Sequence, residues 1–173
     1  VAPHCHAMFI VYIALMSDLV LTSIDAAGLA TLTLNRPEAR NALSPELIEA
    51  MNEAVEVVHR ETASGAVRVL ILAGAGKSFC AGMDLKGVLS DPKEMAEMLR
   101  GLALFSRRVR RLPIPTIARV QGAAVGGGCG LMVVTDFAFT HPEAKVGYPE
   151  VDLGVCPAVV APWLIRKIGA GRA

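Results

Sequence analysis

Two stretches of small residues in this chain would present backbone N–H groups to a negatively charged ligand. They are CAGMDL at 80–85 and VGGGCG at 125–130. Each is expected to join a loop to the start of a helix, where N–H groups lack intrahelical partners and the helix dipole is positive. Two such donors converging on one point would stabilise a developing oxyanion. The structural alternative is that the glycines serve tight turns and close packing and that Asp84 caps a helix.

Two glycine-containing segments were compared with phosphate-binding fingerprints, and neither matches. The sequence GAGKS at 74–78 ends like a Walker A loop, but Ile71 occupies the place of that loop's first glycine. A dinucleotide fingerprint would need a third glycine three positions after Gly128, where the chain has Leu131. A nucleotide-binding protein stays open as an alternative, to be recognised by ATP binding that depends on Lys77.

Alternating strands and helices must position these stretches. Ser44 followed by Pro45, and Asp91 followed by Pro92, predict the starts of two amphipathic helices. Apolar runs bounded by turn residues predict the strands. The expected strands lie at 19–25, 29–35, 67–74, 115–122, 136–140 and 144–149, and the expected helices lie at 44–60, 91–112, 126–135 and 160–169. This alternation predicts an α/β fold, and the first two strands are expected to form a hairpin.

Four segments in register resemble the crotonase superfamily, the enoyl-CoA hydratase/isomerase family. They are LNRPEARNAL (34–43), KSFCAGMDL (77–85), GGGCGL (126–131) and GYPEVDLGVCP (147–157), and the resemblance runs from about residue 18 to residue 173. It implies a spiral of ββα units with two roughly perpendicular sheets surrounded by helices. It also implies that the protein binds acyl-CoA thioesters and stabilises an enolate in a backbone oxyanion hole.

The resemblance assigns roles to individual residues. The N–H groups of Met83 and Gly127 would hold the thioester oxygen, and Met83, Asp84, Leu85 and Lys86 would lie along CoA. Arg36 is a further candidate for contact with CoA. A second set of arginines (Arg107, Arg108, Arg110 and Arg111) is either a contact for CoA phosphates or the solvated end of a helix, where cations also suit the dipole.

The acid–base residues depart from the pattern of typical hydratases, which have two glutamates. The first of these positions is Gly130 here, and the second is Glu150, which is expected to carry proton transfer. Local similarity favours hydration of a 2-enoyl-CoA of the methylglutaconyl type. One glutamate alone suits the alternative, a Δ3–Δ2 enoyl-CoA isomerase. A dienoyl-CoA isomerase is disfavoured because its additional aspartate would fall at Ala158. The alternative that is not an enzyme is a truncated, inactive domain that binds CoA.

Composition and charge restrict the partners. A formal net charge of +1 argues against a nucleic-acid surface, and four scattered cysteines without a CxxC pair favour reduced thiols and a cytoplasmic location. No cofactor or metal is expected, since CoA is part of the substrate. The apolar run at 8–16 is too short to span a bilayer, so no membrane association is expected.

The ends of the chain lead to two further expectations. Residues 1–15 are interpreted as an N-terminal extension outside the family pattern, and residues 16–173 as a crotonase-like domain that lacks the family's C-terminal helices. The family pattern predicts a homotrimer or hexamer.

Overall fold

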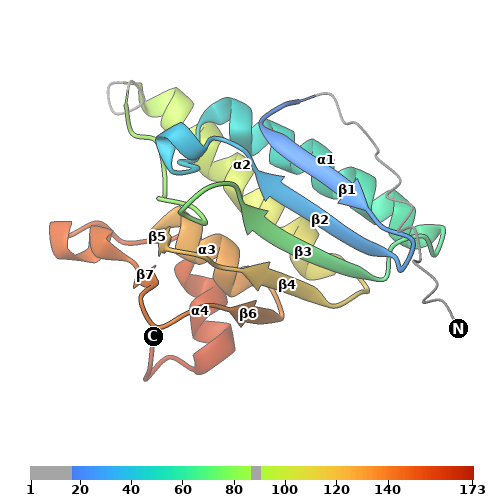
Figure 1. Ribbon diagram of the computed structural model, residues 1–173. Coiled ribbons are helices and arrows are strands. Elements are labelled where there is room, and N and C mark those ends of the chain that lie inside the picture. The colour runs from blue at the N-terminus through green and yellow to red at the C-terminus, as the bar shows by residue number, and fades with distance from the viewer. Residues whose placement is uncertain (1–16, 87–90) are drawn as a thin grey trace, which may run out of the picture.

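A five-stranded sheet forms the centre of the structure, a computed structural model that describes residues 17–86 and 91–173 (Figure 1). The expected extension at 1–15 lies outside the described residues. The strands of this sheet, in spatial order, are β1 (Val20–Ile24), β2 (Leu29–Leu34), β3 (Val69–Gly74), β4 (Thr116–Arg119) and β6 (Phe137–Phe139). β1 pairs antiparallel with β2, and the other neighbouring pairs are parallel. A second sheet pairs β5 (Ala123–Val125) with β7 (Lys145–Gly147) in parallel.

The predicted hairpin between β1 and β2 is confirmed. The Asp25 carboxylate accepts hydrogen bonds from the N–H groups of Ala27 and Leu29, both at 2.9 Å. Gly28 closes the turn with φ of +82°, a conformation that side chains rarely adopt. The turn is therefore specified locally, which is why the sequence predicts it.

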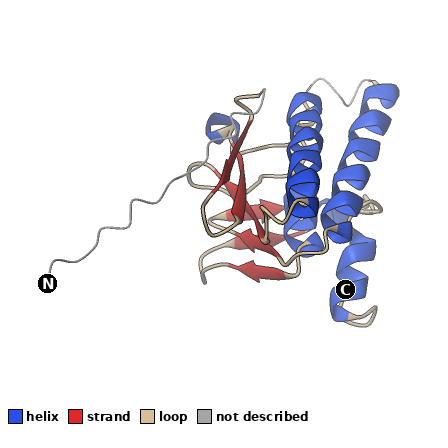
Figure 2. Cartoon of the chain, turned by 90° about the vertical axis from the view of Figure 1, so that its right-hand side faces the viewer, coloured by secondary structure: helices blue, strands red, loops and turns tan. Residues whose placement is uncertain are grey.

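Two long helices cover one face of the large sheet (Figure 2). They are α1 (Pro45–Ala63) and α2 (Pro92–Arg111). The Ser44 hydroxyl accepts the N–H of Leu47, and the Asp91 carboxylate accepts the N–H groups of Lys93 and Glu94. Both helix starts are thus the predicted ones. None of the described helices combines the length and the apolarity needed to cross a lipid bilayer.

The hydrophobic core lies between this face and the helices. Alternate residues of β1 and β2 are buried, as expected for strands with one covered face. The facing positions on the helices recur at helical spacing: Leu47, Met51, Val55 and Val58 on α1, and Met98, Leu102, Phe105 and Val109 on α2 are all buried.

Two shorter helices complete the α/β fold that the sequence predicts. They are α3 (Gly127–Val134) and α4 (Ala161–Ile168), which pack against each other. Two 3₁₀ turns, η1 (Pro37–Ala39) and η2 (Pro149–Leu153), and strand β5 were not expected from the sequence. All three lie in the segments that build the candidate site.

Candidate functional site

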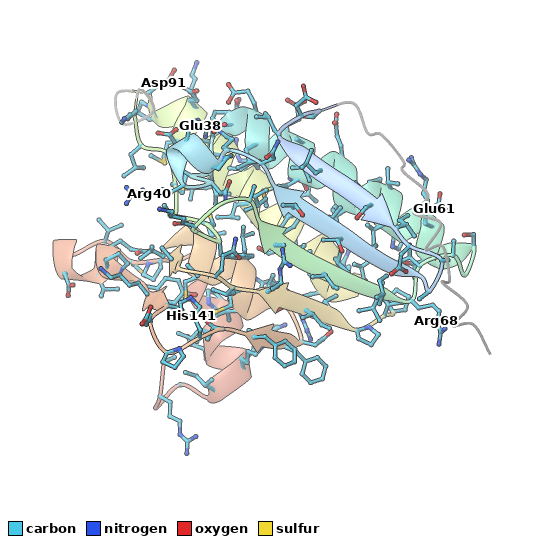
Figure 3. The ribbon with its side chains drawn as sticks, viewed as in Figure 1. Glu38, Arg40, Glu61, Arg68, Asp91 and His141 are labelled. Atoms are coloured by element: carbon cyan, nitrogen blue, oxygen red, sulfur yellow. The ribbon has the colours of Figure 1, made fainter. Side chains whose placement is uncertain are left out.

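The candidate site forms where the parallel strands β2, β3 and β4 end, because the loops that follow them meet there. Figure 3 shows Glu38, Arg40 and Asp91 at this end of the sheet, and Glu61 and Arg68 at the opposite end. The carboxyl edge of a parallel sheet is a common place for ligands in α/β proteins.

Asn41 joins the loops after β2 and β3. Its side chain is fully buried, and its amide N–H₂ donates to the carbonyl oxygens of Ala75, Ser78 and Phe79 at 2.8–3.2 Å. Its amide oxygen accepts the N–H of Arg36 at 2.9 Å. Asn41 thereby fixes the segment that leads into the CAGMDL stretch. The sequence analysis missed this residue, although a polar side chain inside the NRPEARNAL segment was a possible signal.

The backbone around Met83 leaves one N–H group without an acceptor. Leu43 donates its N–H to the Gly82 oxygen, and Asp84 donates its N–H to the Leu43 oxygen, both at 2.8 Å. Because N–H groups alternate in direction along an extended segment, the N–H of Met83 points away from Leu43. No hydrogen bond from it is formed to any of the described residues.

The start of α3 contains two glycines whose backbone conformation or close contacts disfavour a side chain. Gly126 has φ of +53° and ψ of −121° and donates its N–H to the Gly147 oxygen at 2.9 Å. A Cβ atom on Gly128 would lie 2.3 Å from the Cys80 oxygen. The two glycines therefore allow the backbone to turn sharply and to approach the CAGMDL stretch closely.

Met83 and Gly127, the two predicted N–H donors, are neighbours in the structure. A Cβ on Gly82 would lie 3.8 Å from the Gly127 nitrogen, and a Cβ on Gly127 would lie 3.6 Å from Cγ of Met83. Gly127 is the first residue of α3, so its N–H has no acceptor within the helix. Two backbone N–H groups without an acceptor among the described residues thus lie on adjacent segments, and that of Gly127 is at a helix N-terminus, where the dipole favours negative charge.

Glu150 lies beside the same helix start. It belongs to η2, and its carboxylate oxygens are 3.3 and 3.5 Å from the position of a Cβ on Gly126. The side chain is half-buried. The structure therefore brings together Met83, Gly127 and Glu150, the three residues expected to be catalytic.

Gly130 supplies no carboxylate, and Val160 occupies the space next to it. A Cβ on Gly130 would lie 2.2 Å from Cγ1 of Val160 and 2.6 Å from its Cβ. Val160 itself is buried. This contact between α3 and the residue before α4 was not foreseen from the sequence, and Glu150 is the carboxylate that the structure places beside the start of α3.

The remaining predicted CoA residues form the edge of the site. Arg36 forms an ion pair with Asp84 at 3.2 Å and donates to the Ala42 oxygen at 2.7 Å, so its guanidinium holds the Met83 loop. Leu85 is 44% exposed and Lys86 is exposed. The Asp84 carboxylate also accepts the N–H of Lys86 at 3.4 Å in a turn. Asp91, rather than Asp84, is the residue that caps the next described helix.

A buried thiol and a buried phenol lie under the helix start. Burial raises the pKa of Cys129, the neighbouring Tyr148 hydroxyl lowers it, and the Glu150 charge raises it. Burial also raises the pKa of Tyr148, and Cys129 and Glu150 act in the same direction. The Tyr148 hydroxyl forms no hydrogen bond with the described residues. Both side chains therefore stay protonated at neutral pH.

Two of the arginines near the end of α2 are engaged in ion pairs. Arg108 pairs with Glu56 at 3.4 Å, and Arg110 pairs with Asp136 at 2.7 Å. Within residues 17–86 and 91–173, no three histidine, cysteine, aspartate or glutamate side chains are grouped closely enough to hold a metal ion.

Comparison with known proteins gives consistent matches. The sequence profile of the family "Enoyl-CoA hydratase/isomerase" matches residues 25–173. The chain is 35% identical over 164 residues to the 1,2-epoxyphenylacetyl-CoA isomerase of Escherichia coli, covering 91% of this chain and 60% of that protein. It is 38% identical over 143 residues to an enoyl-CoA isomerase/hydratase of Mycosarcoma maydis, covering 79% of this chain and 52% of that protein.

Solved structures agree with these sequence matches. The crystal structure of an enoyl-CoA hydratase from Mycobacterium smegmatis superposes with a TM-score of 0.82 at 34% identity, covering 90% of this chain and 60% of that one. AtuE of Pseudomonas aeruginosa superposes with a TM-score of 0.81 at 33% identity, covering 90% and 60%. The chain thus spans between half and about 60% of the length of these relatives.

Proposed function

The chain belongs to the enoyl-CoA hydratase/isomerase family, and from this premise we propose that it stabilises the enolate of an acyl-CoA thioester with the N–H groups of Met83 and Gly127. The observation that carries the proposal is the adjacency of these two free donors at the start of α3. CoA would lie along Met83, Asp84, Leu85 and Lys86, next to Arg36. No cofactor beyond CoA takes part in this proposal.

Stabilisation of an enolate is a reaction step that two backbone N–H donors can promote. Removal of a proton from C2 of a thioester, or addition of water to C3 of a 2-enoyl thioester, gives an enolate, whose charge gathers on the thioester oxygen. Two fixed backbone donors stabilise this oxygen more strongly in the transition state than in the neutral ground state. Loss of one donor typically raises the barrier by about 3 kcal/mol.

Glu150 is the proposed acid–base group, since its carboxylate lies at the same helix start. The first candidate reaction is hydration of a 2-enoyl-CoA of the methylglutaconyl type. Glu150 would take a proton from water as the water oxygen bonds to C3, and the enolate carbon C2 would then take that proton from Glu150. One carboxyl group thus serves in turn as base and as acid.

The second candidate is migration of the double bond from C3 to C2, and the contact between Gly130 and Val160 favours it. An apolar side chain fills the space where typical hydratases have a further glutamate, so no second carboxylate lies at position 130 to orient a water molecule. Glu150 would remove a proton from C2 of a 3-enoyl-CoA and return it to C4, through the same enolate.

Product analysis distinguishes the two reactions. The purified chain is incubated with 3-methylglutaconyl-CoA and with 3-hexenoyl-CoA, and the products are separated by chromatography. A 3-hydroxyacyl-CoA product supports hydration, and 2-hexenoyl-CoA supports isomerisation. Binding of CoA esters without either product would support the inactive CoA-binding domain and would contradict the catalytic proposal.

Glu150→Gln tests the acid–base assignment. The amide keeps the size of the side chain but accepts no proton, so kcat should fall by two orders of magnitude or more while binding of CoA esters persists. Near-normal kcat in this variant would overturn the assignment.

Gly127→Val tests the donor assignment. Its Cβ would lie 2.9 Å from Leu43 Cδ1 and would crowd the helix start, so turnover should be lost while circular dichroism still reports a folded chain. Gly171→Val is the matched control, because no atom lies within 4 Å of a Cβ there. Retained turnover in Gly127→Val would remove the assignment.

The family pattern also supports a homotrimer or hexamer and a cytoplasmic location as part of this proposal. These statements concern the whole protein, and the chain spans about 60% of the length of several of its relatives.

A further inference from the structure

The segment that carries Glu150 exposes most of its described side chains. This segment, η2 (Pro149–Leu153), lies at the margin of the molecule, beyond β7 (Figure 1). Pro149, Val151 and Asp152 are exposed, and Val151 is 55% exposed. Exposed side chains bury little surface against the rest of the chain. They therefore do not fix the place of the Glu150 carboxylate beside the start of α3.

Tyr148, the residue before η2, has a side chain that is anchored in the fold. It packs against the hydrophobic core, although the residue as a whole is half-buried. Its hydroxyl group is buried beside the thiol of Cys129, a residue of α3. Tyr148 thereby connects η2 with the helix whose first residue is Gly127.

The backbone on both sides of Tyr148 links this anchor to the candidate site. Before it, the Gly147 oxygen accepts the N–H of Gly126 at 2.9 Å, which ties β7 to the residue before α3. After it, the Tyr148 oxygen accepts the N–H of Val151 at 3.3 Å, which closes the first turn of η2 around Glu150. The anchored ring and the carboxylate are thus parts of one hydrogen-bonded segment.

We propose that Tyr148 is a positioning residue, whose aromatic ring holds the Glu150 carboxylate at the start of α3. This inference rests on the proposed function, which assigns proton transfer to Glu150. Pro149 alone separates the two residues, and its φ is restricted, so the link between the ring and the carboxylate is short and stiff. Misplacement of a reacting group by about 1 Å can cost as much as a hundredfold in rate.

The ring, rather than the hydroxyl group, is assigned this role. The Tyr148 hydroxyl forms no hydrogen bond with the described residues, so its removal breaks no such contact among them. Burial of a hydroxyl group without a partner also costs free energy. Tyr148→Phe should therefore keep Glu150 in place, whereas Tyr148→Ala should not.

Steady-state kinetics test the inference with whichever enoyl-CoA the unmodified chain converts, at a temperature at which circular dichroism shows every variant to be folded. Tyr148→Ala should lower kcat by at least about tenfold. The dissociation constant of a saturated ester, butanoyl-CoA, should stay within about twofold, because neither Met83 nor Gly127 is changed. Tyr148→Phe should keep both quantities within about twofold of the unmodified chain.

Ile114→Ala is the matched control. Ile114 is also half-buried and packs against the core, but it precedes β4, at the end of the sheet opposite the candidate site. Its loss should leave kcat within about twofold. If Tyr148→Ala does not fold, Tyr148→Leu takes its place, because leucine keeps an apolar contact but lacks the outer part of the ring. Its kcat should then lie below that of Tyr148→Phe.

Hydrogen exchange measured by NMR gives a second readout that needs no turnover. The N–H of Gly126 donates to the Gly147 oxygen at 2.9 Å, and the N–H of Val155 donates to the Glu150 oxygen at 3.0 Å. Both N–H groups should exchange at least about fivefold faster in Tyr148→Ala than in Tyr148→Phe or Ile114→Ala, because η2 opens more often.

Unchanged kcat in Tyr148→Ala, or an equal fall in Tyr148→Phe, would overturn the inference and leave the proposed function standing. An equal fall in Ile114→Ala would show a general effect of lost packing and would overturn it as well. Absence of turnover in the unmodified chain would overturn the proposed function. Exchange at Gly126 and Val155 would then decide whether Tyr148 anchors η2.

Discussion

At the scale of single residues, the buried side chain of Asn41 holds together the loops of the candidate site. Its fully buried amide bonds to three carbonyl groups and to the N–H of Arg36. It also adopts φ of +56°, which asparagine tolerates better than most residues. Asn41 thus fixes the loops that hold the Met83 segment through hydrogen bonds to their backbone.

Asn41→Ala should lower the free energy of unfolding by about 3 kcal/mol, because buried carbonyl groups lose their donors. Urea denaturation followed by circular dichroism measures this change. Asn35→Ala is the control: its exposed amide makes one hydrogen bond, to the Asp18 oxygen at 2.8 Å, and the loss should stay below about 1 kcal/mol. Equal losses in both variants would contradict the role of Asn41.

The described cysteines should differ sharply in reactivity. Burial raises the pKa of Cys80 to about 12. Since the thiolate is the reactive form, only about 10⁻⁴ of this thiol is ionised at pH 8, whereas Cys156 is exposed. Iodoacetamide at pH 8 should modify Cys156 rapidly and Cys80 only after denaturant is added, as measured by mass spectrometry of peptides. Rapid labelling of Cys80 in the folded chain would contradict its burial.

At the scale of elements, the contact between α3 and the start of α4 decides which side chains position 130 accepts. A Cβ at Gly130 meets both Cγ1 and Cβ of Val160, so shortening Val160 to alanine would not relieve the clash. A glutamate at this position, as in typical hydratases, therefore requires a different approach of α4.

A double-mutant cycle measures this contact. Gly130→Ala should lower the free energy of unfolding by about 1–3 kcal/mol through overpacking. In the background of Val160→Gly, the same change should cost at least about 1 kcal/mol less, because the added methyl group fills the space of the lost side chain. Thermal and urea denaturation of the four proteins give the coupling energy. Strictly additive effects would contradict the contact.

The starts of α1 and α2 and the hairpin turn were predicted from the sequence because local chemistry specifies them. Ser44 and Asp91 cap α1 and α2, and Asp25 and Gly28 build the hairpin turn, all through neighbours in the chain. Strand β5 was missed because its pairing with β7 joins residues more than 20 positions apart. Its three residues carry no pattern of their own.

In the candidate site, too, features set by neighbours in the chain were predicted, and features set by the packing of distant segments were not. The position of Gly127 at a helix start follows from the glycine run, but its closeness to Met83 and Glu150 was expected only from the family resemblance. The occupation of the space beside Gly130 by Val160 depends on how α4 packs, which neither the residue types nor the spacing indicates.

At the scale of the whole molecule, one edge of the large sheet carries exposed aromatic side chains. Phe137 and Phe139 of β6 are 57% and 63% exposed, and alternation places them on the same face. β6 is an edge strand among the described residues, so its outer N–H and C=O groups have no strand partner there. Exposed apolar edges of this kind favour association.

The chain should therefore self-associate through β6. Sedimentation velocity should show oligomers whose fraction rises with concentration, and Phe137→Lys combined with Phe139→Lys should return the chain to a monomer. Leu21→Lys, at a 49% exposed position on β1 at the other edge, is the control and should leave the association unchanged. A chain that is monomeric at every concentration would contradict this expectation.

The order of strands in the large sheet has a consequence for biosynthesis. From β1 through β2, β3, β4 and β6, each strand pairs with the one before it in the sheet's order, and that order follows the chain. During translation, each newly emerged strand can thus add to an edge that already exists. Strand β7, which completes the small sheet, and η2 both follow β6 in the chain, so a nascent chain can complete its large sheet before Glu150 has left the ribosome. The proposed acid–base carboxylate would thus be added to a large sheet that is already assembled.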